Sequence, residues 1–189
     1  MENIRFFNEV AQTWDERCKH NLNKIQRIIN LSDIQAHSKI LDVGTGTGIL
    51  LSFLLEKEPF KITALDYAEK MIECAKKKYK DARIEFVAED IMQHQEKDYD
   101  YIFLYSVYPH FDDKKELFRH LFSKLKQGGK IIIAHSECKE KINSVHEKVM
   151  LFKRAILPSA NSTVSIMQNF FKIEQVIDTN EMYYISAIK

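Results

Sequence analysis

The chain has 189 residues, of which 45% are hydrophobic and 29% charged, with a formal net charge of +1. This length suits one domain that buries a continuous core, and the near-neutral charge gives no large field to attract a nucleic acid. The three cysteines (Cys18, Cys74, Cys138) are scattered, and no apolar stretch is long enough to span a bilayer or to serve as a signal peptide. We therefore expect a cytoplasmic protein that contacts neither membrane nor nucleic acid.

The first segment, residues 1–37, precedes the earliest strand signal. Phe6, Phe7, Val10 and Trp14 recur at helical spacing within it. This pattern predicts helices that form a cap over one edge of a core built from residues 38–189. Cap and core are expected to belong to a single domain.

Strand and helix signals alternate through the first part of the core. Runs of β-branched and aliphatic residues predict strands at 39–43, 61–65, 83–87, 99–104 and 130–134. Apolar residues at helical spacing predict helices over 49–54, 68–79 and 117–125, and Gly128-Gly129 is expected to end the last of these. Strands that alternate with helices are typical of a parallel sheet with helices on both faces.

The last part of the chain departs from this alternation. Residues 139–154 have a helical pattern, residues 158–163 have the composition of a loop, and two strand patterns follow at 170–177 and 182–188. Asp178-Thr179-Asn180-Glu181 supplies turn residues between them. This arrangement predicts a closing antiparallel hairpin.

A glycine-rich loop, Leu41-Asp42-Val43-Gly44-Thr45-Gly46-Thr47-Gly48, joins the first predicted strand to the next helix. Open α/β sheets bind ligands at such a junction, where glycines let the backbone approach the ligand. The spacing fits neither the G-x-G-x-x-G dinucleotide motif nor a phosphate-binding P-loop. Asp42 would repel a pyrophosphate but attract an ammonium or sulfonium group. A tight turn without a ligand is the alternative.

Acidic residues follow the next two predicted strands. Asp66 closes the second strand, where a carboxylate can accept hydrogen bonds from both ribose hydroxyls. Glu89-Asp90 follows the third strand and could accept from an adenine amino group, with Met71 and Ile91 covering the ring. A helix cap beside a solvated acid, and a core role for Met71, are the alternatives. Together with Asp42, these acids fit an adenosine with a cationic tail.

In this order, the motifs resemble those of class I S-adenosylmethionine-dependent methyltransferases. The loop at 41–48 resembles the family's first motif, and residues 125–133 resemble its late turn into the fifth strand. Residues 6–15 resemble the cofactor-covering segment of the small-molecule branch, which includes ubiquinone/menaquinone methylase-like proteins. The resemblance implies a Rossmann-like, doubly wound, mostly parallel seven-stranded sheet, with S-adenosylmethionine as cofactor and S-adenosylhomocysteine as product.

The motifs and the resemblance together predict a set of cofactor-binding residues. Its members are Trp14, Asp42, Gly44, Thr45, Gly46, Gly48, Asp66, Tyr67, Met71, Glu89, Asp90, Ile91 and Tyr105. For Trp14, packing of the N-terminal helix is an equally simple role. The lysines at 76–78 are expected to form a solvated helix face.

The segment after the fourth predicted strand bears on the acceptor. The family's amino-methyltransferase signature, Asn/Asp-Pro-Pro-aromatic, is absent, and Tyr105-Ser106-Val107-Tyr108-Pro109-His110 stands there instead. This difference argues against methylation of DNA bases or glutamine. His110 follows the fourth strand and His135 the fifth, so both are candidate general bases for a hydroxyl acceptor, with His110 first. A structural role at the rim is the alternative for both.

No metal is expected, because His135, Cys138 and His146 match no usual zinc spacing. The predicted activity is methyl transfer to a small-molecule acceptor by in-line displacement. Methylation of RNA or protein, and a catalytically silent module that only binds S-adenosylmethionine, are the alternatives; a nicotinamide-dependent oxidoreductase is more distant. The sequence fixes neither the acceptor nor the oligomeric state.

Overall fold

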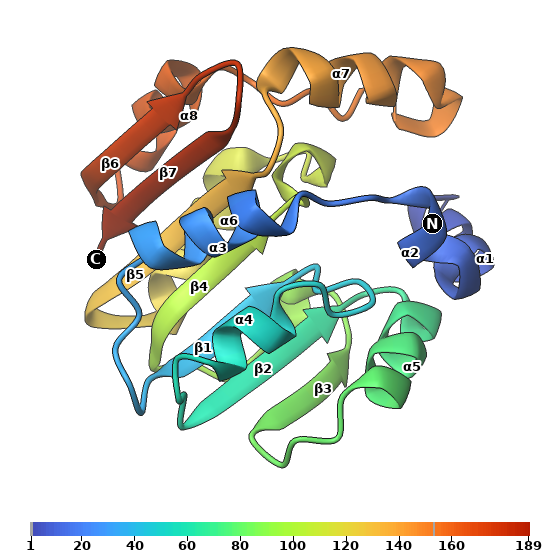
Figure 1. Ribbon diagram of the computed structural model, residues 1–189. Helices are drawn as coiled ribbons and strands as arrows, with labels where there is room; N and C mark the ends of the chain where they lie inside the picture. The colour runs from blue at the N-terminus through green and yellow to red at the C-terminus, as the bar shows by residue number, and fades with distance from the viewer. Residues whose placement is uncertain (1, 153) are drawn as a thin grey trace. The chain divides into compact units, whose positions relative to one another are not determined.

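The computed structural model describes residues 2–152 and 154–189. They divide into two compact units, the first ending at Glu96 and the second beginning at Lys97 (Figure 1).

The first unit contains three parallel strands and most of the predicted helices. Its strands are β1 (Lys39–Val43), β2 (Lys61–Asp66) and β3 (Ile84–Ala88), in the order β3-β2-β1. Its helices are α1 (Glu2–Val10), η1 (Ala11–Thr13), α2 (Trp14–Arg17), α3 (Leu22–Leu31), α4 (Leu51–Leu55), α5 (Glu69–Lys78) and η2 (Ile91–Gln93). The three strands predicted in this part of the chain are confirmed to within one residue at each end.

Helices cover this part of the sheet, and the strand residues are accordingly apolar. Ile40, Leu41 and Ile62 are fully buried, as expected for parallel strands enclosed on both faces. The helix α3 packs beside α4, whereas α1 and η1 pack on α5 (Figure 1). A hydrogen bond from the Lys70 amide to Asn8 Oδ1, 2.9 Å long, joins α5 to α1. The predicted N-terminal cover is therefore helical and rests on α5.

The second unit contains four strands and the closing hairpin. Its strands are β4 (Tyr99–Tyr105), β5 (Leu125–His135), β6 (Lys172–Asp178) and β7 (Tyr183–Ile188), in the order β4-β5-β7-β6. Its helices are η3 (Tyr108–His110), α6 (Lys114–Lys124), α7 (Lys139–Lys148), η4 (Met150–Phe152) and α8 (Ala160–Met167). The strands β4 and β5 are parallel, and β7 is antiparallel to both β5 and β6. The predicted hairpin is thus confirmed.

The prediction of a loop over residues 158–163 is wrong, because α8 begins at Ala160. Ser159 caps this helix through a hydrogen bond of 3.2 Å from the Ser162 amide to its hydroxyl oxygen. The Ala160 amide donates to Asp178 Oδ2 at 2.9 Å, a partner that is distant in sequence. The serines and asparagine suggested a loop, but they form a capped helix start.

Two predicted helix ends also require correction. The helix predicted over 139–154 is shorter, since α7 ends at Lys148 and is followed by η4; residue 153 lies outside the described residues. The helix α6 ends at Lys124 instead of continuing to the glycine pair. Gly128 lies within β5, where the pairing with β4 shifts register and φ is +77°.

Across the described residues, the strands have the predicted fold class: a Rossmann-like, doubly wound, mostly parallel seven-stranded sheet with a C-terminal antiparallel hairpin. None of the described helices has the length and apolar character needed to span a membrane.

Candidate functional site

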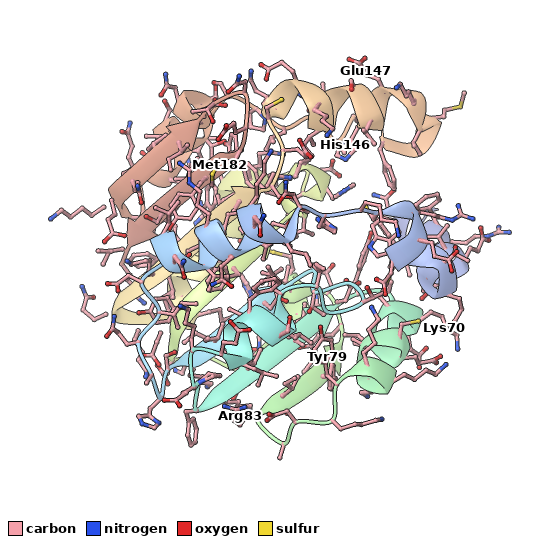
Figure 2. The ribbon with its side chains drawn as sticks, in the orientation of Figure 1. Lys70, Tyr79, Arg83, His146, Glu147 and Met182 are labelled. Atoms are coloured by element: carbon pink, nitrogen blue, oxygen red, sulfur yellow. The ribbon has the colours of Figure 1, made fainter. Side chains whose placement is uncertain are left out.

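The glycine loop after β1 is tied closely to the rest of the first unit. The amides of Gly44 and Thr45 both donate to the Leu65 carbonyl, at 2.8 and 3.0 Å, which fixes the loop against the end of β2. At Gly48 a Cβ atom would lie 2.9 Å from the Tyr79 ring and 2.8 Å from Leu51 (Tyr79 is labelled in Figure 2). Glycine is therefore required at this position for close packing of the loop on α5 and α4.

Gly46 serves a different purpose, because the space beside it is open. Its φ is +56°, and a Cβ atom there would meet only the Trp14 indole nitrogen, at 3.9 Å. The Trp14 ring packs edge-on against the Phe7 ring, with ring centroids 5.5 Å apart. The Phe7 ring in turn packs against the Tyr67 ring, with ring centroids 6.1 Å apart. These three rings form an aromatic cover that includes the predicted residues Trp14 and Tyr67. Bare backbone at Gly46, with Trp14 beside it, is suited to a ligand that lies against the loop.

Asp66 links the glycine loop to the start of α5. Its Oδ2 accepts from the Gly46 amide at 2.8 Å, and its Oδ1 accepts from the Ala68 amide at 2.9 Å. Burial raises the pKa of the Asp66 carboxyl to about 6, although these two amide bonds oppose the rise. Because each carboxylate oxygen has more than one acceptor site, Asp66 can also receive ribose hydroxyls.

Asp42 lies at the end of β1 and is only 2% exposed. Among the described residues, no group forms a hydrogen bond with its Oδ2 atom. Burial raises the pKa of Asp42 to about 7; the nearby Thr45 hydroxyl opposes this rise, and the charge of Asp66 adds to it. A buried carboxylate oxygen without a donor is unfavourable, so this atom marks a place where a cationic ligand group would be stabilised.

Sheet geometry relates Asp42 to Asp66 but not to Asp90. The register pairs Asp42 with Ala64 and Asp66 with Ala88, so alternation of side chains puts both aspartates on one face. Asp90 lies beyond the end of β3, where it caps the start of η2, so alternation along the strand does not assign it to a face.

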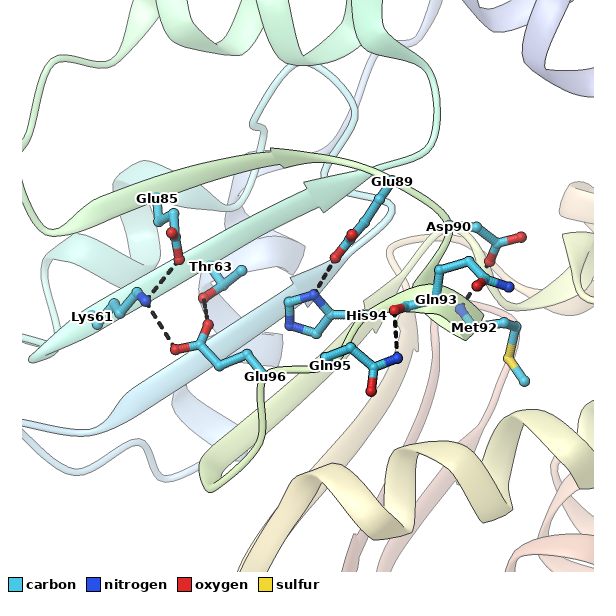
Figure 3. Close-up of polar contacts among 10 residues, drawn as sticks. All are labelled: Lys61, Thr63, Glu85, Glu89, Asp90, Met92, Gln93, His94, Gln95 and Glu96. Carbon is cyan, nitrogen blue, oxygen red and sulfur yellow. Dashed lines mark hydrogen bonds and ion pairs between the residues drawn. The ribbon is translucent and has the colours of Figure 1, made fainter.

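The two acids that follow β3 have different contacts (Figure 3). The Glu89 carboxylate pairs with Nδ1 of His94, a side chain that is almost fully buried. Asp90 Oδ1 accepts from the Met92 amide at 2.9 Å and so caps η2, as the alternative interpretation expected. The structure thus places Glu89 against His94 and Asp90 at the start of η2, and a contact of either acid with the cofactor stays a prediction.

The two apolar residues predicted to cover an adenine are both buried. Met71 lies in a cluster with Val10, Ala11 and Cys74, beneath the aromatic cover, so it has a core role. Ile91 begins η2 and is 3% exposed. A contact of either residue with adenine stays a prediction.

One polar link in this unit has no signature in the sequence. The Thr47 hydroxyl donates to Asp15 Oδ1 at 2.5 Å, and Lys78 Nζ forms an ion pair with the other oxygen of Asp15. We call these three residues the latch, because they connect α2 to the glycine loop and to α5. Lys78 was expected only as part of a solvated face, since spacing alone does not show which carboxylate meets a surface lysine.

In the second unit, two of the predicted residues are buried at the ends of neighbouring strands. Tyr105 donates its hydroxyl to Ser136 Oγ at 2.9 Å. His135 is 1% exposed and packs edge-on against Tyr183, with ring centroids 6.0 Å apart. A cofactor contact of Tyr105 and a catalytic role of His135 stay predictions.

His110 belongs to a separate cluster of rings. Its centroid is 5.1 Å from that of His146, which is labelled in Figure 2, and 5.0 Å from that of Phe152. Burial lowers the pKa of His110 to about 4, and the charges of His146 and Lys114 add to this effect. His110 is therefore neutral at pH 7 and a weak base. His146 Nδ1 bonds to the Ala155 carbonyl oxygen at 2.5 Å.

The first unit thus offers a consistent set of groups to one kind of ligand. The bare backbone at Gly46 allows a ligand to approach closely, and the carboxylate of Asp66 suits a ribose. The Oδ2 atom of Asp42, which has no hydrogen-bond partner among the described residues, suits a cationic tail. These groups fit S-adenosylmethionine. In the part of the chain that the structure describes, no group of three or more His, Cys, Asp or Glu residues is arranged to hold a metal ion.

Comparisons with known proteins agree with this geometry. Residues 40–129 match a family described as a methyltransferase domain. The malonyl-[acyl-carrier protein] O-methyltransferase 1 of Ilyobacter polytropus is 32% identical over 188 residues, which cover 96% of this chain and 66% of that protein. The demethylmenaquinone methyltransferase of Thermotoga maritima is 29% identical over 143 residues, which cover 69% of this chain and 59% of that protein. The chain therefore spans less than two thirds of the length of either relative.

Among solved structures, a putative S-adenosyl-L-methionine-dependent methyltransferase from Methanococcus maripaludis is similar over the whole chain. Its TM-score is 0.68 at 25% identity, with 100% of this chain and 92% of that chain covered. The motifs, the fold and the relatives all agree. The chain belongs to the class I S-adenosylmethionine-dependent methyltransferases.

Proposed function

We propose that this chain transfers a methyl group from S-adenosylmethionine to a small-molecule acceptor. The observation that carries the proposal is the buried Asp42 Oδ2, for which the described residues supply no hydrogen-bond donor. A buried carboxylate with a raised pKa at the glycine loop is explained by a cationic ligand, and the cofactor has both an ammonium and a sulfonium group.

Each candidate site residue of the first unit has a role in this proposal. Asp66 holds the ribose, Asp42 faces the cationic tail, and Gly46 leaves room for the ligand beside Trp14. Asp90 takes the adenine side, since it follows β3 and caps the start of η2, next to Ile91. The other predicted contacts in the glycine loop, the cover and the helices beside them are Gly44, Thr45, Gly48, Tyr67, Met71 and Ile91.

When bound, the cofactor supplies a methyl group on a positively charged sulfur. The chain's own residues then hold the acceptor in line and exclude water. A base is needed only for an acceptor that carries a proton at its reacting atom. The lowered pKa of His110 makes it a weak base, so we propose that it orients the acceptor rather than removing a proton from it. His135 is the second candidate.

The names of the relatives favour an oxygen acceptor on a small or carrier-bound molecule, because malonyl-[acyl-carrier protein] O-methyltransferases recur among them. The test is transfer of labelled methyl from S-adenosylmethionine to a panel: a malonyl thioester, demethylmenaquinone, phosphoethanolamine, RNA and protein. We expect label in one of the small molecules. Label only in RNA or protein would favour the alternative acceptors. Cofactor binding without transfer to any acceptor would favour a silent binding module.

We further propose that residues 1–189 act as one methyltransferase domain, with residues 1–37 as its helical cap. The family match over residues 40–129 supports this, because it runs past the boundary between the two units at Glu96. A single cooperative thermal transition is the expected result, and two separate transitions would contradict it.

The cysteines at 18, 74 and 138 are free thiols, which suits the reducing cytoplasm.

A further inference from the structure

Figure 3 shows the segment that follows β3, residues 89–96, with its contacts to Lys61 and Thr63 of β2. Alternation along β2 puts these two side chains on the opposite face of the sheet from Asp42 and Asp66. At its far end, Glu96 Oε1 lies 3.0 Å from the ammonium nitrogens of both Lys39 and Lys61. At its near end, the Glu89 carboxylate pairs with His94. The segment is thus anchored to the sheet by Glu96 at its far end and, at its near end, by the Glu89 amide, which donates to the Asp66 carbonyl at 3.1 Å. The pair of Glu89 and His94 joins two residues of the segment itself.

Between these anchors lies the short helix η2, which is hydrogen-bonded at both of its ends. The Asp90 carboxylate accepts from the Met92 amide at 2.9 Å, and the Asp90 carbonyl accepts from the Gln93 amide at 2.8 Å. The His94 amide donates to the Ile91 carbonyl at 3.1 Å. The backbone of His94 therefore ends the turn while its side chain reaches back to the residue that precedes it.

The bond between His94 and Glu89 has a defined direction. An ionised carboxylate can only accept, so Nδ1 of His94 carries the hydrogen. The His94 side chain is 5% exposed and that of Glu89 is 35% exposed. The donor is buried and the acceptor is a carboxylate, so the bond restricts the residues that it encloses.

We propose that His94 is a positioning residue of the cofactor site: by pairing with Glu89, it fixes the turn that carries Asp90 and Ile91 to the adenine. This inference rests on the proposed function, because it takes Asp90 as the acid on the adenine side. His94 does not itself touch the cofactor. It acts through the backbone of residues 89–94.

A purely structural role for His94 predicts a different outcome. The ion pairs of Glu96 with Lys39 and Lys61 anchor the end of the segment without His94, and the Thr63 hydroxyl adds a bond of 3.4 Å to Glu96. Loss of the His94 bond should therefore loosen the turn and leave the sheet intact. The effect should appear in recognition of the adenine rather than in affinity for every ligand.

The test compares calorimetric binding of S-adenosylhomocysteine with that of S-inosylhomocysteine, which has a carbonyl in place of the adenine amino group. Wild type should prefer the adenosyl ligand. In His94→Phe, which removes the donor and keeps the ring volume, we expect adenosyl affinity to fall roughly tenfold while inosyl affinity changes little. His94→Asn, whose amide can replace Nδ1, should restore part of the preference. Gln95→Ala is the matched control, because the Gln95 side chain in the same turn is exposed and donates to the Gln93 carbonyl.

A double-mutant cycle with Glu89→Leu completes the test, since the two substitutions should not be additive if one bond carries the effect. Circular dichroism checks that each variant is folded. If His94→Phe does not fold, the ligand preferences of His94→Asn and Glu89→Leu test the inference in its place. A folded His94→Phe with unchanged preference, or with equal losses for both ligands, would overturn the inference. Absence of adenosyl binding in wild type would instead contradict the proposed function.

Discussion

Asp42 and Asp66 are buried carboxylates whose pKa values are raised to about 7 and about 6. Because the ordinary value for aspartate is about 3.9, the folded chain binds these protons more tightly than the unfolded chain does. Their contribution to the free energy of unfolding is fully present below about pH 4. It is lost as the pH rises towards 7.

We therefore expect Asp42→Asn to raise the stability of the ligand-free protein at pH 8 and to reduce the decline in stability between pH 4 and 7. The amide has a similar shape and needs no costly ionisation in a buried place. Urea unfolding at several pH values measures this. A variant that is less stable than wild type at pH 8, with an unchanged pH dependence, would show that Asp42 is ionised and paired.

The same raised pKa predicts proton release when the cofactor binds. A cationic ligand favours the ionised form of Asp42, so affinity for S-adenosylmethionine should increase from pH 5.5 to pH 8. Calorimetry at pH 6.5, in buffers of different ionisation enthalpy, should detect released protons, and Asp42→Asn should release fewer. Equal proton release in both proteins would assign the titration to another group.

Gly46→Val should abolish most cofactor binding, because a side chain would occupy the open space beside Trp14. Gly128→Val is the matched control: Gly128 also has a positive φ, but a Cβ there meets nothing within 4 Å. Both substitutions should cost about 1–3 kcal/mol of stability through backbone strain. Calorimetry should then show loss of binding only for Gly46→Val, and equal binding by both variants would remove the loop from the site.

Among the elements, the N-terminal cover is connected to the glycine loop through the latch of Asp15, Thr47 and Lys78. Exposed ion pairs are worth about 1 kcal/mol or less and are weakened by salt. Asp15→Asn or Lys78→Met should therefore weaken cofactor binding by at most about fivefold. Hydrogen exchange in residues 2–17 should become faster in both variants.

Lys77→Met provides the control for this prediction, because Lys77 is exposed on the same helix. The difference between Lys78→Met and Lys77→Met should shrink at high salt. Equal exchange rates in all three proteins would show that packing of α1 and η1 on α5, rather than the latch, holds the cover in place.

The elements also show why some of the structure could be predicted and some could not. The strands β1, β2 and β4 are recognisable because continuous apolar runs next to glycine or acidic residues have few other interpretations. The helix α8 was not predicted because Ser159 and Asn161 are typical of loops as well as of helix starts, and the added bond from the Ala160 amide to Asp178 joins residues far apart in sequence. The same limit applies to His94, whose role depends on a pairing with Glu89 that residue spacing does not reveal.

At the scale of the whole molecule, the fold class and the family could be predicted because several motifs occur in a fixed order along one chain. Asp42, Asp66 and the glycine loop share the end of neighbouring strands, which parallel topology requires. The two histidines proposed for the acceptor side carry no such constraint. His110 ends η3, which follows β4, and His135 ends β5, and the two lie in different clusters of side chains.

The central claim is that the first unit binds S-adenosylmethionine through Asp42, Asp66 and the glycine loop. The most direct test is calorimetric titration of the full chain with S-adenosylmethionine and S-adenosylhomocysteine, with NAD as the control. We predict micromolar binding of both adenosyl ligands, weakened in Asp66→Asn, and no binding of NAD. Binding of NAD, or of no ligand at all, would contradict the claim.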